Sequence, residues 1–325
     1  MAIFILFIGI STLILVHEFG HFLAAKRFGL LVEEFGIGFP PRLFAKKIGE
    51  TVWSVNALPF GGFVRIHGEK PELAPDPAAI DRSRSFAYVS LGKRASIVGA
   101  GILMNFLLGW LLITAVYAVG IPQRLVVADV QPDTPAALAG FLSGDVVQGF
   151  TAADAFIERV NASRGAAFEV TVERDGVLLT LSATPRIEVP EGEGALGLSL
   201  RELGQERLPL APSIGKGLTA SFEILWSILA SIGTLITGLL SGAAVTEQFV
   251  GPIGIFGIAE ASARFGFVHL VELIGLISLN LVVLNALPIP ALDGGRLFFL
   301  AIEAVKGSPL PARREALANA IGFVL

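Results

Sequence analysis

The stretch LILVHEFGHFLAAKR, residues 13–27, places a His-Glu-x-x-His pattern inside an apolar segment that begins at the first residue of the chain. His17, Glu18 and His21 are costly in a lipid bilayer, and ionisable residues within a membrane usually have a function. The pattern therefore raises two questions: whether the segment crosses a membrane, and what the three polar side chains do there.

Residues 2–25 are long enough to cross a bilayer as a helix. Lys26 and Arg27 follow the apolar run, which indicates a spanning helix whose C-terminal end lies in the cytoplasm. A cleaved signal peptide is the alternative interpretation. The segment has no positive N-terminal region and its apolar run contains three ionisable residues, so it does not fit that pattern.

The composition of the whole chain also indicates a membrane protein. Of 325 residues, 53% are hydrophobic and only 16% charged, with a mean hydropathy of +0.72, whereas a soluble domain has about 25% charged residues. The net charge of −4 does not suggest a nucleic-acid partner. The chain has no cysteine, so disulfides, thiolate metal ligands and cysteine nucleophiles are excluded. Any metal must be bound by nitrogen and oxygen atoms.

Polar and apolar segments alternate along the chain. Residues 26–95 are polar, and the stretch ETVWSVNALPFGGFVRIHGE at 50–69 is typical of short strands around a Pro/Gly turn. Residues 96–119 carry no charge and are long enough to span. Residues 267–287 are the next clear candidate for a spanning helix. The last apolar segment, 316–325, is shorter than the roughly 20 residues that a span needs.

Residues 121–186 have the pattern of a small soluble α+β domain. A strand, a Pro-rich turn, a short helix and a second strand are expected first. Apolar residues then alternate with polar ones from Phe168 to Val172 and again from Val177 to Leu181. Asp175 and Gly176 lie between these runs and have the sequence of a hairpin turn.

The distribution of basic residues predicts the topology. Lys and Arg are frequent in 26–95 and again from Arg296 to Arg314, and such segments tend to be cytoplasmic. The inserted domain is then outside, and the 267–287 helix runs from outside to inside. Residues 218–240 are apolar enough to span, but this order requires them to lie at the membrane interface.

His17 and His21 are four residues apart, so on a helix their imidazoles project from one face and can bind one zinc ion. Glu18 lies beside them and can take a proton from water at the zinc. The alternative is a pair of histidines that face a water-filled cavity without metal.

A catalytic zinc needs a third protein ligand and an open position. Asp293 is the best candidate, because it lies at the inner end of the third span, at the depth of the histidine pair, provided that residues 218–240 do not cross. Taken alone, it also fits a turn residue before Gly-Gly. His67 and His269 are interpreted as ordinary loop or interface histidines.

Polar and helix-breaking residues near these ligands indicate a cavity. Pro288 and Pro290 interrupt the helical hydrogen bonding, and irregular backbone at membrane depth is tolerated where it lines a cavity. Asn285 could bind an extended substrate there or could satisfy the carbonyls of its own helix. Asn105, four residues after the small Gly101, has the same two interpretations, and Gly101 permits close approach of helices.

These motifs together resemble the site-2 proteases, intramembrane zinc metalloproteases of the bacterial regulator-of-sigma-E type. The resemblance is carried by HEFGH at 17–21, GILMN at 101–105, NALPIPALDGG at 285–295, NALPFGGFVRI at 56–66, TPAALAGFLSGDVV at 134–147 and FVGPIGI at 249–255. It covers nearly the whole chain in order. The chain departs from the best-known bacterial members in having one PDZ-like domain where they have two.

The resemblance implies zinc ligands at His17, His21 and Asp293, with Glu18 as the general base. It implies cleavage of single-pass membrane proteins within or near their transmembrane segments, after another protease has trimmed them, with anti-sigma factors or signal-peptide remnants as usual substrates. It places the chain in the bacterial inner membrane. Residues that would contact substrate are Asn285, Asn105, Pro288, Gly61 and Gly62.

The expected fold is a multi-pass α-helical membrane protein with three spans and an incomplete fourth, an inserted extracytoplasmic α+β PDZ-like domain, and a cytoplasmic membrane-associated β-hairpin. In chain order, the segments are a zinc-motif helix (1–25), a loop with the hairpin (26–95), a span (96–119), the PDZ-like domain (121–186), a linker with an interfacial helix (187–266), a span ending in LDGG (267–295), and a cytoplasmic segment that begins the last helix (296–325).

Two other functions fit parts of the sequence. A membrane scaffold could use the PDZ-like domain to bind peptides without any role for Glu18 or Asp293. A zinc transporter or sensor is the other alternative, but transporters usually show repeated, symmetric polar sites. This sequence has one such site and no internal repeat.

Overall fold

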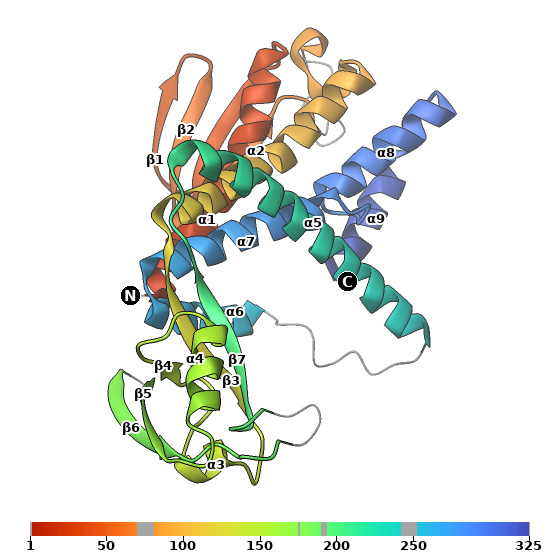
Figure 1. The fold of residues 1–325 in the computed structure, drawn as a ribbon. Helices are drawn as coiled ribbons and strands as arrows, with labels where there is room; N and C mark the ends of the chain where they lie inside the picture. Colours follow the sequence, from red (N-terminus) through yellow and green to blue (C-terminus); the bar gives the residue numbers. More distant parts are fainter. Residues whose placement is uncertain (1, 70–80, 175, 190–193, 242–251, 325) are drawn as a thin grey trace. The chain divides into compact units, whose positions relative to one another are not determined.

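The computed structural model describes residues 2–69, 81–174, 176–189, 194–241 and 252–324 (Figure 1). The chain forms two compact units, Met1–Ala115 with Leu210–Leu325, and Val116–Pro209. Within the described residues, four helices are long and apolar enough to cross a membrane: α1 (Ala2–Arg27), α2 (Leu91–Val119), α5 (Leu210–Ser241) and α7 (Phe267–Ala286). The protein is thus a multi-pass membrane protein that also contains β-sheets.

Helices α1 and α7 run parallel to each other. Near their N-terminal ends, Leu6 and Leu270 share one buried cluster, and Gly9 lies against Ile274. Helix α2 runs antiparallel to both. Gly109 lies against Leu279 and Ile113 against Gly275, while on α1 His21 contacts Ile97 and His17 contacts Asn105. These small residues allow the helix backbones to approach closely, and the three helices form the frame of the first unit.

Helix α5 crosses this frame rather than running alongside it (Figure 1). It packs on α2 through Phe106 and Phe222, whose ring centroids are 5.3 Å apart. Trp110 Nε1 also donates to the carbonyl of Ile214, at 3.1 Å. The helix begins earlier than the predicted 218–240 segment, and it includes all of that segment. The shorter helix α6 (Pro252–Phe265) packs with the N-terminal ends of α1 and α7.

The predicted hairpin forms, and the chain reverses direction in it more than once. Strand β1 (Val32–Ile48) pairs antiparallel with β2 (Thr51–Ile66), and the chain reverses between Ile48 and Thr51. The chain also reverses around Pro59 and Gly61, within the predicted stretch, because residues 52–55 run parallel to 34–37 and residues 62–65 run antiparallel to them. Gly61, with a positive φ of 69°, lies in this reversal, and Ile37 pairs with Val55 on one side and with Gly62 on the other.

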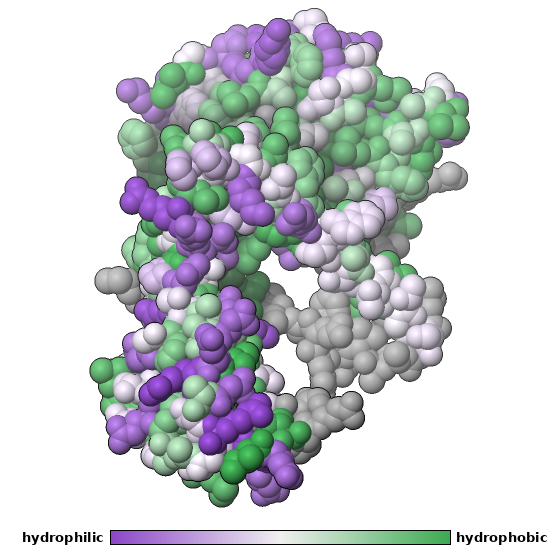
Figure 2. Space-filling view, in the orientation of Figure 1, coloured by the Kyte–Doolittle hydropathy of each residue, from purple (hydrophilic) through white to green (hydrophobic). Residues whose placement is uncertain are grey.

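The hairpin carries large apolar side chains that are exposed in the isolated chain. Leu43 is 69% exposed and Phe44 is 63% exposed, and a soluble protein would rarely gather such side chains on one element. The space-filling view shows hydrophobic residues over much of the first unit as well (Figure 2). Short 3-10 helices η3 (Arg82–Arg84) and η4 (Phe86–Tyr88) connect to α2.

The second unit is a five-stranded sheet with the order β6-β5-β4-β3-β7. The strands are β3 (Ile121–Val130), β4 (Val146–Val147), β5 (Phe168–Arg174), β6 (Val177–Ala183) and β7 (Leu198–Gln205), with helices α3 (Pro135–Ala139) and α4 (Ala153–Ala162). The β5–β6 hairpin is confirmed, since Val172 pairs with Leu179; Asp175 in its turn lies outside the described residues. The sheet extends past residue 186, because β7 pairs with β3.

After α7 the chain turns sharply. Helix α8 (Asp293–Lys306) begins at the predicted ligand itself, and α9 (Ala312–Val324) follows. The segment between α7 and α8 contains both prolines and a hydrogen-bonded turn, in which Leu292 N–H donates to Ile289 O at 3.2 Å. This turn brings Asp293 back toward α1.

Candidate metal centre

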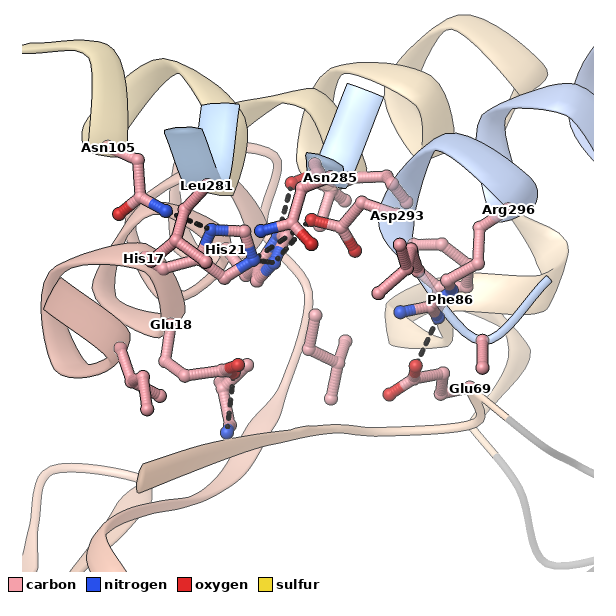
Figure 3. A pocket seen from close by; sticks show the side chains of 17 residues that line it. His17, Glu18, His21, Glu69, Phe86, Asn105, Leu281, Asn285, Asp293 and Arg296 are labelled. Atoms are coloured by element: carbon pink, nitrogen blue, oxygen red, sulfur yellow. Dashed lines mark hydrogen bonds and ion pairs between the residues drawn. The ribbon is translucent and has the colours of Figure 1, made fainter. Parts of the chain in front are cut away.

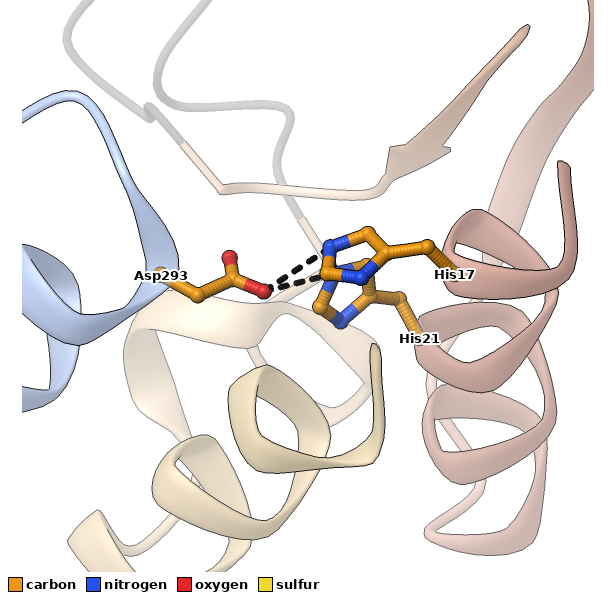
Figure 4. Close-up of side chains that lie close together, drawn as sticks. All are labelled: His17, His21 and Asp293. Carbon is orange, nitrogen blue, oxygen red and sulfur yellow. Dashed lines mark hydrogen bonds and ion pairs between the residues drawn. The ribbon is translucent and has the colours of Figure 1, made fainter. Parts of the chain in front are cut away.

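Three potential ligand atoms converge from two distant segments (Figure 4). Asp293 Oδ2 lies 3.0 Å from His17 Nε2 and 3.2 Å from His21 Nε2, and the two Nε2 atoms are 3.2 Å apart. In a tetrahedral zinc site with nitrogen and oxygen ligands at about 2.0–2.2 Å, neighbouring ligand atoms lie roughly 3.3–3.5 Å apart. The spacing of the three atoms therefore fits a zinc ion.

The polar atoms of the cluster are incompletely satisfied without a cation. All three residues are buried, and the contacts of Asp293 Oδ2 with the two Nε2 atoms are ion pairs only if the histidines are protonated. If the Nε2 atoms carry lone pairs, the buried carboxylate needs a cation to balance its charge. Two imidazoles and a carboxylate are also a usual donor set for catalytic zinc. Chemistry and spacing thus both favour a metal at this position.

Groups on α2 orient the two imidazoles. His21 Nδ1 lies 2.8 Å from the carbonyl oxygen of Ile97, which fixes Nδ1–H as the donor and leaves the Nε2 lone pair directed at the centre. His17 Nδ1 lies 3.2 Å from the Asn105 side-chain amide. With Nδ2 facing His17, Asn105 Oδ1 is buried without a partner. A half-turn of this amide lets Oδ1 accept from Nδ1–H, which leaves the His17 Nε2 lone pair directed at the centre.

Glycine allows α2 to approach the histidines. A Cβ atom at Gly101 would lie 2.5 Å from His21 Nε2 and 2.8 Å from His17 Cε1. At Gly20, on α1, a Cβ atom would lie 2.4 Å from the carbonyl oxygen of Ala100. Both positions exclude any larger side chain without movement of the helices. The sequence interpretation of Gly101 as a close-approach residue agrees with this packing.

The Gly-Gly pair after Asp293 has a similar role. A Cβ at Gly294 would lie 2.1 Å from the carbonyl oxygen of Leu287, and one at Gly295 would lie 2.3 Å from that of Ile289. The first turn of α8 therefore fits closely inside the irregular segment that precedes it. This packing fixes where α8 begins, and so where the Asp293 carboxylate points.

Glu18 lines the same cavity as the three ligand candidates (Figure 3). Its Oε2 accepts a hydrogen bond from the backbone N–H of Val64 on β2, at 3.1 Å. The hairpin edge and the glutamate are therefore in direct contact. The sequence pattern alone did not predict this contact, because the donor is a backbone group.

The cavity has a volume of about 360 Å³. Asn105 and Asn285, both predicted to contact substrate, line it. Pro288, Gly61 and Gly62 are not among its lining residues. A Cβ at Gly62 would lie 2.6 Å from both Gly36 O and Leu15 Cδ2, so this glycine lets the hairpin approach α1 just before His17.

Sequence reasoning missed a charged group at one end of the cavity. Arg296 forms an ion pair with Glu69 and lies over the ring of Phe86, 5.6 Å from its centroid, and all three residues line the cavity. The position of Arg296 three residues after Asp293, one turn along α8, could have suggested this. His67 instead pairs with Glu33 at 2.7 Å, and His269 contacts Phe265; neither belongs to the cluster.

Comparison with known proteins defines the class. The chain belongs to peptidase family M50, the site-2 protease family, whose model matches residues 5–325. This confirms the family predicted from the motifs. The protein is therefore a zinc metalloprotease with Zn²⁺ as its cofactor.

Several curated relatives cover nearly the whole chain. A zinc metalloprotease RasP of Geobacillus kaustophilus is 31% identical, with 97% of this chain and 92% of the relative covered. The regulator of sigma-W protease RasP of Bacillus subtilis is 28% identical, with 96% and 92% covered. A putative zinc metalloprotease of Brucella suis is 34% identical, with 97% and 89% covered.

Proposed function

We propose that the protein hydrolyses peptide bonds at membrane depth, with zinc bound by His17, His21 and Asp293. The observation that carries this proposal is the convergence of two Nε2 atoms and one Oδ2 atom within 3.0–3.2 Å of one another. Bound zinc supplies a Lewis acid that activates water and polarises the scissile carbonyl. The three ligands leave one position open for these groups, as in other catalytic zinc sites.

Glu18 is proposed as the general base. Its carboxylate lies in the same cavity as the ligands, adjacent in sequence to His17, and is held by Val64 N–H through Oε2. This hydrogen bond leaves Oε1 available to take a proton from the attacking water. The same carboxylate then donates the proton to the leaving amine, so that Glu18 is unchanged after one cycle.

The substrate is proposed to bind as an extended strand beside β2. The N–H of Val64 points away from β1 toward α1, and backbone groups two residues apart on a strand point the same way. The edge of β2 next to the cavity can therefore pair with a peptide. Asn285 lines the cavity and can bind the peptide backbone with its amide.

Single-pass membrane proteins already trimmed by another protease are the proposed substrates. A helix that crosses the membrane must unwind before its backbone can reach the zinc, and pairing with β2 would replace the lost hydrogen bonds. One relative, from Bacillus subtilis, is named a regulator of sigma-W protease. Anti-sigma factors and signal-peptide remnants fit this substrate class.

We further propose that the second unit is a PDZ-like domain outside the cytoplasm, in a chain located in the bacterial inner membrane. Helix α7 is parallel to α1 and antiparallel to α2, so α2 ends on the side where α7 begins. The chain must then cross an even number of times between them. A single crossing by α5 would make this number odd. The helix directions therefore favour an α5 that lies at the membrane interface, with three full spans before α9.

The direct test measures bound zinc and cleavage of a transmembrane substrate by the full-length chain in detergent. Wild type should hold about one zinc per chain, and Asp293→Ala should lose most of it. Glu18→Gln should keep zinc and lose cleavage. Asp154→Ala, an exposed acid on α4, is the matched control and should resemble wild type.

Two results would contradict the proposal. Retained cleavage by Glu18→Gln would show that Glu18 is not the general base. Full zinc in Asp293→Ala would show that the third ligand lies elsewhere. Peptide binding by a protein that holds no zinc under native conditions would instead favour a membrane-anchored binding module.

A further inference from the structure

Helix α9 contacts the irregular segment that carries Asp293. The Ala291 backbone N–H donates to Asn319 Oδ1 at 2.9 Å. One turn further along α9, a Cβ atom at Gly322 would lie 2.3 Å from the carbonyl oxygen of Pro290. The last helix therefore packs directly against the two residues that precede Leu292 and Asp293.

Ala291 has an unusual backbone conformation. Its φ is +74°, and among the described residues only Asp133 is another non-glycine with positive φ. The left-handed region is unfavourable for alanine, because its Cβ crowds the following carbonyl. Such a conformation persists only where the surroundings hold it. The Asn319 side chain is the contact that meets the Ala291 N–H directly.

Ala291 is also close to the metal centre. Ala291, Leu292 and Asp293 all line the cavity with the two histidines. A hydrogen bond from Leu292 N–H to Ile289 O closes the turn that contains Ala291. From one side Gly294 and Gly295 pack inside it, and from the other side Asn319 and Gly322 support it. A change in the Ala291 φ would rotate the chain immediately before the Asp293 carboxylate.

We propose that α9 is part of the scaffold of the metal centre, and that Asn319 is a positioning residue for Asp293. By holding Ala291 in the left-handed conformation, Asn319 keeps Asp293 Oδ2 at the histidine pair. This inference rests on the zinc ligation by Asp293 proposed above. It assigns to α9 a role in metal retention.

The first test compares zinc release from full-length variants into excess chelator. Loss of a group that orients a ligand typically weakens metal binding by about 10–100-fold, so Asn319→Ala should release zinc at least ~10-fold faster than wild type. Leu317→Ala is the matched control, because Leu317 lies on the same helix and is 64% exposed. It should release zinc at the wild-type rate.

The second test separates backbone positioning from a general loosening of α9. Glycine adopts positive φ without the alanine penalty, so Ala291→Gly needs less support. The double variant Ala291→Gly, Asn319→Ala should therefore release zinc more slowly than Asn319→Ala alone. With Co²⁺ in place of zinc, Asn319→Ala should alter the visible absorption of the bound ion, whereas Leu317→Ala should not.

The outcomes separate this inference from the proposed function. If Asp293→Ala retains zinc, the ligand assignment fails first. If Asp293→Ala loses zinc while Asn319→Ala keeps the wild-type release rate, the role of α9 is overturned alone. It is also overturned if the double variant Ala291→Gly, Asn319→Ala releases zinc as fast as Asn319→Ala alone. Should Asn319→Ala fail to fold, Gly322→Ala tests the same contact by displacing Pro290, and release at the wild-type rate would reject the inference.

Discussion

The absence of a side chain at residue 101 is as important to the proposed metal centre as the proposed ligands themselves. The Gly101 backbone occupies the space next to both imidazoles, and even one methyl group would overlap His21 Nε2. Gly99 lies on the same helix, and a Cβ atom there would meet no atom within 4 Å. Alanine at residue 101 therefore tests crowding together with helix propensity, and alanine at residue 99 tests helix propensity alone.

We expect Gly101→Ala to displace the histidines and to lower zinc affinity by at least ~10-fold. Overpacking at this position should also destabilise the protein by about 1–3 kcal/mol. Gly99→Ala should bind zinc as wild type does and gain about 0.5–1 kcal/mol from helix propensity. Zinc competition and thermal unfolding measure both quantities. Equal zinc affinities in the two variants would contradict the crowding argument.

The sequence predicted the side chains of the site better than its backbone contacts. His17, Glu18 and His21 follow from one spacing rule, and Asp293 follows from depth in the membrane. The Val64 N–H bond to Glu18 and the Asn319 bond to Ala291 could not be predicted, because they join segments whose relative positions only the folded chain defines. The ion pair of Arg296 and Glu69 was missed for the same reason.

Among the secondary-structure elements, the hairpin turn is fixed by charge as well as by backbone pairing. Arg84 donates from Nη1 and Nη2 to the two carboxylate oxygens of Glu50, at 2.6 and 2.7 Å, and Lys26 Nζ lies 3.5 Å from Glu50 Oε2. The turn of the hairpin, the segment before α2 and the end of α1 meet at this carboxylate. Composition predicted a Pro/Gly turn within 50–69 but not this second reversal between Ile48 and Thr51.

This cluster predicts a pH dependence. The Arg84 guanidinium lowers the pKa of Glu50 from 4.5 to about 2, so the ion pair stabilises the fold fully above pH 4.5 and is lost as the pH falls toward 2. Glu50→Gln should have a lower unfolding midpoint than wild type at pH 7, and the difference should close between about pH 4.5 and 2. Glu158→Gln, an exposed acid on α4, serves as the control. A constant difference at all pH values would refute this account.

For the molecule as a whole, the antiparallel frame of α1, α2 and α7 constrains the path of the chain through the membrane. Hydropathy identifies four candidate spans, which is one more than the number expected from the distribution of basic residues. Length and composition could not decide whether α5 crosses, because its apolar content suits both a span and an interfacial helix. The relative directions of the neighbouring helices carry the missing information.

The absence of cysteine makes this topology directly measurable, since a single introduced thiol has no background. Ser90, Thr151 and Ser241 are exposed, and each can be replaced by cysteine and treated with a membrane-impermeant maleimide. Thr151→Cys and Ser241→Cys should react from one face of the membrane, and Ser90→Cys from the other. Reaction of Ser241→Cys from the same face as Ser90→Cys would mean that α5 crosses.

The three converging donor atoms also determine when, during synthesis of the chain, the proposed zinc site can form. His17 and His21 are synthesised long before Asp293. At about 5–20 residues per second, synthesis separates the two by tens of seconds. Throughout that interval the nascent protein has two of the three proposed zinc ligands. With the proposed ligand set, proteolytic activity therefore begins only after Asp293 has been synthesised, and a chain interrupted before that residue has no complete zinc site.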